Sequence, residues 1–171
     1  MNARRLLFIF AFEMNLRVYI ETTVVSYLTA RPSRDLLMAA RQEVTCEWWD
    51  RRLGDFDCYI SQLVIDEASE GDALAAEKRL DAVKSFSLVP VDDSVITLAE
   101  KLVSSALIPA IAADDALHIA LAAVHGMNYL LTWNFKHIAN AGKTEAIREA
   151  CALAGFTCPV ICTPEELLEE S

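Results

Sequence analysis

Residues 114–134, DDALHIALAAVHGMNYLLTWN, contain the pattern of a helix followed directly by that of a strand. The surrounding run 112–126 is strongly apolar, with two aspartates near its start and a glycine at its end, and this predicts a helix. The segment 128–132, NYLLT, is short and apolar, which predicts a buried strand. A helix that leads directly into a strand is one unit of an alternating α/β pattern.

The same alternation extends in both directions from this unit. Strands are predicted at 16–20, 57–61, 87–90 and 159–162. Helices are predicted at 33–54, with Ser33 as N-cap, and at 62–72, 73–86, 93–106, 143–155 and 163–170. Strands that alternate with helices imply a mostly parallel sheet with helices on both faces. No repeat or linker divides the chain, so we expect a single domain over residues 14–171.

Residues 1–13 need a separate interpretation. They contain two arginines followed by a short apolar run, which is the outline of a signal peptide. No small-residue cleavage site follows, however, and Met14 lies directly before the first predicted strand. We therefore expect residues 1–13 to be a flexible or non-native lead-in that takes no part in the fold.

Composition narrows the class of protein. No run approaches the roughly 18 apolar residues of a membrane span, so no membrane association is expected. The five cysteines form no close pair and no zinc-binding pattern, which favours a reducing compartment and hence the cytoplasm. The formal net charge of −10 argues against broad, non-specific binding to nucleic acid, but it is compatible with a cation site and with a basic protein partner.

Acidic and polar residues recur where predicted strands end, and ligands of open parallel sheets bind outside the carboxyl ends of the strands. These residues are Glu21, Glu67, Asp114, Asp115, Thr132 and Asn134. Carboxylates that converge there would raise one another's pKa values unless a cation were bound. Oxygen ligands favour Mg²⁺ or Mn²⁺ over Zn²⁺, and such a metal can support hydrolysis of a phosphodiester. For each acid alone, a favourable place at a helix N-terminus is an equally good interpretation.

Four segments together resemble a known family: VYIETTVVSYL, SQLVIDEASEGD, DALHIALAAVHGMNYLLTWNFKHIANA and PVICTPEELL. They are similar to the PIN-domain family, and specifically to its VapC-like branch, many members of which are ribonuclease toxins of toxin–antitoxin pairs. The resemblance covers residues 16–168. It implies a three-layer α/β/α sandwich, a Mg²⁺- or Mn²⁺-dependent endoribonuclease acting on RNA, a cognate antitoxin as partner, and a homodimer.

The resemblance also implies roles for individual residues. The three acids of the family match Glu21, Glu67 and Asp115, which are the expected metal ligands. The position after the fourth strand matches Asn134, with Thr132 two residues before it, and both are expected to orient water or a ligand. The family usually has aspartate in place of Glu21, and often in place of Asn134, so one bound metal is favoured over two.

Two other classes of protein fit parts of the pattern. A PIN-like domain that has lost catalysis and serves as an RNA- or protein-binding module would account for Glu21, Asn134 and the acidic balance. A phosphate-handling protein of receiver type also gathers acids at strand ends, but it needs a lysine at a late strand end that NYLLTWN does not supply. No glycine-rich phosphate loop or nucleophile elbow supports nucleotide-dependent or acyl-transfer chemistry.

Several further side chains have two interpretations. His118 is expected in the core or behind the ligands rather than on the metal. Lys136 and His137 either meet substrate phosphate or lie in a solvated loop. Trp48 and Trp49 either pack against neighbouring elements or contact a partner, because aromatic side chains are enriched in interfaces.

Overall fold

The computed structural model describes residues 15–168, so the expectation for residues 1–13 lies outside the described part. Its centre is a sheet of five strands in the order β3-β2-β1-β4-β5, and every neighbouring pair is parallel. The strands are β1 (Leu16–Ile20), β2 (Phe56–Ser61), β3 (Ser87–Val89), β4 (Tyr129–Leu131) and β5 (Val160–Cys162). The predicted parallel sheet is confirmed, with each predicted strand within a few residues of its observed bounds.

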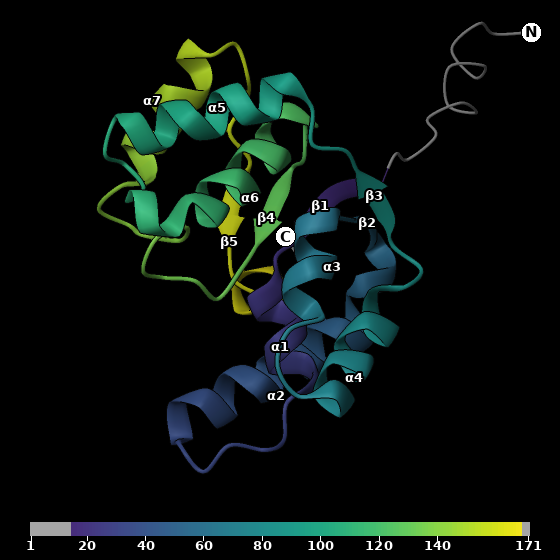
Figure 1. Cartoon of the computed structure of the whole chain (residues 1–171). Coiled ribbons are helices and arrows are strands. Elements are labelled where there is room, and N and C mark those ends of the chain that lie inside the picture. The colour runs from purple at the N-terminus through teal and green to yellow at the C-terminus, as the bar shows by residue number, and fades with distance from the viewer. Residues whose placement is uncertain (1–14, 169–171) are drawn as a thin grey trace, which may run out of the picture.

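Two groups of helices enclose the sheet, and Figure 1 shows them on either side of the strands. One group contains α1 (Thr22–Thr29), α2 (Leu36–Arg51), α3 (Gln62–Ala68) and α4 (Ala73–Val83). The other contains α5 (Asp93–Ser104), α6 (Ala113–Val124) and α7 (Thr144–Leu153). The fold is therefore the three-layer α/β/α sandwich that the sequence predicted.

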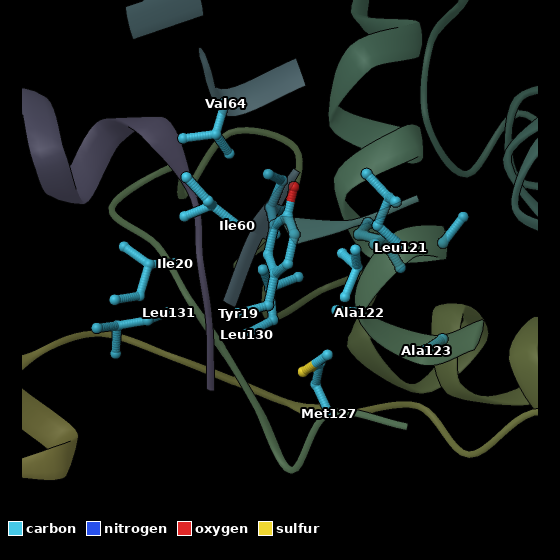
Figure 2. Packing of buried hydrophobic residues seen from close by; sticks show 14 of the residues in the cluster. Tyr19, Ile20, Ile60, Val64, Leu121, Ala122, Ala123, Met127, Leu130 and Leu131 are labelled. Carbon is cyan, nitrogen blue, oxygen red and sulfur yellow. The ribbon is translucent and has the colours of Figure 1, made fainter. Parts of the chain in front are cut away.

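The core lies on both faces of the sheet. Tyr19 of β1 points toward α6, whereas its neighbour Ile20 points to the opposite side, close to Leu131 (Figure 2). All three side chains are fully buried. Successive side chains of a strand alternate between faces, and a sheet covered on both sides buries both sets. This explains why residues 18–20 (VYI) and 129–131 (YLL) are apolar without alternation.

Helix α1 was not predicted, because its threonines and valines have branched β-carbons that favour strands. Two features of the fold outweigh that preference. The Glu21 side chain caps the helix by accepting a hydrogen bond from the Thr23 backbone N–H at 3.0 Å. Val24 and Val25 are fully buried, so the helix is stabilised mainly by its packing.

The start of α2 differs from the prediction. Asp35, not Ser33, is the N-cap, and its carboxylate accepts a hydrogen bond from the Met38 N–H at 2.9 Å. The Ser33 hydroxyl accepts instead from the Asp35 N–H at 3.1 Å. Ser33 therefore supports the turn that leads into the helix, which is a common use of serine next to a cap.

The tryptophan pair of α2 packs inside the fold. Trp48 is fully buried, with its ring centroid 5.8 Å from that of Phe56. Trp49 is half-buried, 5.5 Å from the ring of Phe86, which precedes β3. The packing interpretation accounts for both side chains.

The predicted helix over 163–170 is only a single 3₁₀ turn, Glu165–Leu167, and positions 169 and 170 lie outside the described residues. The Glu166 carboxylate accepts hydrogen bonds from the N–H and hydroxyl of Thr163, at 2.8 and 3.0 Å, which closes the turn locally. Among residues 15–168, no helix has the length and apolarity needed to cross a membrane.

Candidate active site

The candidate site lies at the point in the sheet where the strand order reverses. Strands β2 and β3 lie on one side of β1, and the later strands β4 and β5 lie on its other side. Ile20 and Leu131 are paired in register, and the Glu21 N–H donates to the Leu131 carbonyl at 3.0 Å. Glu21 and Thr132 therefore leave the sheet side by side. In open parallel sheets, this reversal is the usual position of a ligand site.

Glu21 is held in place by hydroxyl and amide donors. Its side chain is only 3% exposed. One carboxylate oxygen accepts from the Thr23 N–H, and the other accepts from the Thr132 hydroxyl at 2.7 Å and from the Thr23 hydroxyl. The Thr132 hydroxyl in turn accepts from the Asn134 N–H at 2.9 Å. The end of β4 thus helps to position the acid that follows β1.

Glu67 comes from α3 and is half-buried. Its Oε2 accepts a hydrogen bond from the Thr22 hydroxyl and lies 3.1 Å from Nε2 of His118. Burial alone would raise the pKa of Glu67, but the hydrogen bond and charge of His118 and the bond from Thr22 outweigh it and hold the pKa below its usual value. Glu67 is therefore an ionised carboxylate with a defined orientation.

His118 connects that carboxylate to the core. It projects from α6, is fully buried, and has its Nδ1 2.9 Å from the Tyr19 hydroxyl. The Tyr19 hydroxyl lies 2.7 Å from the hydroxyl of Ser61 at the end of β2. A hydrogen-bonded chain therefore runs from Ser61 through Tyr19 and His118 to Glu67, and both ring nitrogens of His118 already have a protein partner. Sequence reasoning did not identify Ser61 or Tyr19.

The charge on His118 follows from the acids around it. Burial by itself would lower its pKa, but the hydrogen bond to Glu67 and the negative charges of Glu21, Glu67 and Asp115 raise it above the usual value. The shifts of His118 and Glu67 favour the same state, an ion pair. His118 therefore orients the Glu67 carboxylate by both charge and hydrogen bonding.

Asp115 lies in the first turn of α6 and is half-buried, whereas Asp114 beside it is exposed. The Oδ1 of Asp115 accepts a hydrogen bond from Nδ2 of Asn134 at 2.9 Å. Burial raises the pKa of Asp115, although Asn134 and the nearby His137 and His118 oppose that effect. Asn134 also accepts from the His137 N–H at 3.1 Å, so its amide joins α6 to the loop after β4.

These contacts bring part of the predicted ligand set into one group. Glu21, Glu67 and His118 each offer a ligand atom within 4.8 Å of the others. Asp115 lies outside this compact set and is tied to Asn134. Because both nitrogens of His118 are engaged, carboxylate oxygens are the donors available to an ion. Such donors fit Mg²⁺ or Mn²⁺ better than Zn²⁺.

The loop after β4 carries the two remaining candidates. Lys136 is exposed and His137 is half-buried. Neither side chain is hydrogen-bonded to the acids of the site among the described residues. Lys136 therefore lies in solvent, whereas Nδ1 of His137 is buried and has no hydrogen-bond partner among the described residues.

The sequence matches the PIN domain family over residues 18–143, which is well over half of the chain. The match runs from β1 to the residues after the β4 loop and therefore includes every residue of the candidate site. No curated protein matches the chain. PIN domains are generally nucleases, and PIN nucleases use divalent metals. The chain belongs to the PIN domain family.

Proposed function

We propose that the protein is a Mg²⁺- or Mn²⁺-dependent endoribonuclease, and that it is the toxin of a type II toxin–antitoxin pair. The main support is the grouping of Glu21 and Glu67 with His118, within 4.8 Å, where β1 and β4 leave the sheet. Two carboxylates this close repel each other, and a divalent cation would remove that repulsion. The PIN family match points to nuclease chemistry.

Each proposed ligand of the metal is oriented by a hydrogen bond from another side chain. Glu21, Glu67 and Asp115 would hold the ion, directly or through water, and the ion would supply Lewis-acid activation of water and charge stabilisation at the scissile phosphate. Glu21 is oriented by Thr132, Glu67 by His118 and Asp115 by Asn134. Such supporting hydrogen bonds keep ligands in place and tune their charge.

The toxin assignment rests on the VapC-like resemblance of the sequence. The implied partners are RNA as substrate, an antitoxin protein and a second copy of the chain. The net charge of −10 suits an antitoxin that presents basic residues. Cys46, Cys58, Cys151, Cys158 and Cys162 are all free, which supports a reducing compartment such as the cytoplasm.

Removal of the metal should abolish cleavage. The purified full chain is incubated with a mixed RNA pool in Mg²⁺ or Mn²⁺, and in parallel with excess EDTA. We expect RNA fragments only where metal is present. Without the ion, nothing activates the attacking water or stabilises the charge at the scissile phosphate. Cleavage that persists in EDTA at the same rate would contradict the proposed metal dependence.

Thermal unfolding separates an active metal site from a lapsed binding module. A ligand that binds only the folded state at a hundredfold excess over its Kd stabilises by about 2.7 kcal/mol, which raises the Tm of a chain of this size by roughly 5–10 °C. We expect a rise of this order with Mn²⁺. No rise, together with no cleavage by folded protein, would favour a PIN domain that only binds RNA or protein.

A further inference from the structure

An exposed aromatic ring lies next to the candidate site. Phe135 directly follows Asn134 in the loop after β4, and 44% of its surface is exposed. The guanidinium carbon of Arg41, from α2, lies over this ring at 4.8 Å from its centroid. Two segments far apart in the sequence therefore build one surface feature, an aromatic ring with a cation stacked on it.

Trp133 gives this feature a rigid base. Its ring is buried, and its centroid lies 6.1 Å from that of Phe135. The indole N–H donates to the Thr45 hydroxyl, and the Trp133 backbone N–H donates to the Thr23 hydroxyl, both at 2.8 Å. Thr23 is also a donor to Glu21. The exposed ring is thus attached to the same framework that positions the first acid of the site.

Arg41 has unused hydrogen-bond capacity. Among residues 15–168, its guanidinium takes part in none of the ion pairs, although the chain is strongly acidic. Its aromatic contacts are with Phe135 and, at 5.5 Å, with Trp133. A planar guanidinium held in this way still presents several N–H donors, a geometry that suits phosphate oxygens.

We infer that Phe135 and Arg41 form a nucleotide-binding subsite for single-stranded RNA beside the carboxylates. A base stacks on the exposed part of the Phe135 ring, and Arg41 contacts the neighbouring phosphate. Aromatic side chains bind bases in this way without reading their edges, and only unpaired bases expose their faces. The inference rests on the proposed RNA-cleaving function and adds the two residues that would hold an unpaired nucleotide. A positive group at this position would also offset locally the repulsion between RNA and an acidic protein.

Binding of a single-stranded oligoribonucleotide that contains 2-aminopurine tests the subsite directly. Stacking on an aromatic ring quenches this fluorescent base. The measurement is made in EDTA, so that the RNA stays intact. We expect Phe135→Ala to weaken binding by roughly tenfold, the scale of one lost base–aromatic stack, and to abolish the quenching, while Phe135→Trp keeps both. Arg41→Gln should weaken binding and lower the slope of log affinity against log salt by about one phosphate contact.

Ile111→Ala is the matched control, because Ile111 is 97% exposed and takes no part in the site. This variant should bind as the wild type does. A duplex of the same sequence should compete poorly, because its bases are already stacked. The inference is overturned if Phe135→Ala binds and quenches like the wild type, if Ile111→Ala loses as much affinity, if the duplex competes equally, or if the wild type binds no RNA.

Cleavage assays distinguish failure of the subsite from failure of the proposed function. If the wild type cleaves RNA, Phe135→Ala should raise KM by roughly tenfold and change kcat less, since the stacked base is bound in ground and transition state alike. An unchanged KM would overturn the subsite and leave the nuclease proposal intact. Binding that depends on Phe135 without any cleavage would support the subsite and count against the proposed activity.

Discussion

Asp115→Asn is expected to lower RNA cleavage by roughly a hundredfold or more and to leave the fold intact. Asparagine has nearly the same shape as aspartate, and its amide oxygen can still accept the hydrogen bond that Asn134 donates at 2.9 Å. The substitution removes the negative charge that the proposed metal requires. Removal of one group that stabilises the charge of the transition state, or of one group that supports a metal ligand, lowers enzyme activity by factors of about this size.

Asp114→Asn is the matched control for this prediction. Asp114 is the preceding residue in the first turn of α6, but it is exposed. Both variants lose one charge near the helix N-terminus, so both lose the same favourable interaction with the helix dipole. Initial cleavage rates and thermal unfolding are measured for each. Wild-type activity of Asp115→Asn, or an equal loss in Asp114→Asn, would remove Asp115 from the proposed site.

His118→Ala is expected to lower both stability and cleavage. The substitution empties a fully buried position and removes the ring contacts to Tyr19 and Glu67. The cavity and the lost hydrogen bonds together should cost about 3 kcal/mol, or a Tm lower by roughly 6–12 °C. Cleavage at a temperature where the variant is folded should fall roughly tenfold to a hundredfold, because Glu67 loses the group that orients it.

His125→Ala is the control, at the C-terminal end of the helix that carries His118. His125 follows α6, is half-exposed, and makes one side-chain hydrogen bond, to the Pro90 carbonyl at 2.7 Å. We expect a cost of about 1 kcal/mol and normal cleavage. The rise in Tm caused by Mn²⁺ separates positioning from mere stability: it should shrink in His118→Ala and persist in His125→Ala. A full Mn²⁺ response in His118→Ala would show that Glu67 needs no such support.

The parts of the fold that were predictable have strong periodicity. The apolar helix 112–126 and the strand NYLLT were predicted within a few residues, because the apolar residues of each segment are the ones that the fold buries. Helix α1 was missed because its stability comes from a cap by Glu21 and from the burial of Val24 and Val25, not from local preference. Residues 163–170 are predicted as a helix because proline and acids favour a helix start, but the part up to Leu168 forms only one 3₁₀ turn.

The candidate site was predictable in its location more than in its contacts. Parallel topology places Glu21, Thr132 and Asn134 at one edge as soon as the strands are known. The pairing of Asn134 with Asp115, and the chain that links His118 to Ser61, depend on side-chain positions that no spacing rule supplies. The sequence predicts Glu21 as a metal ligand, whereas its second use as a helix cap depends on the backbone geometry after β1.

The position of β1 between β2 and β4 has a consequence for the order of events during folding. The hydrogen bond between Thr132 and Glu21 joins residues 111 positions apart in the chain. Contacts of such long range form slowly, because a large loop must close first. A ribosome must therefore synthesise most of the chain before β4 can dock against β1 and complete the acidic centre. The carboxylates that follow β1 and lie on α3 and α6 are therefore gathered into one centre only late in the synthesis of the chain.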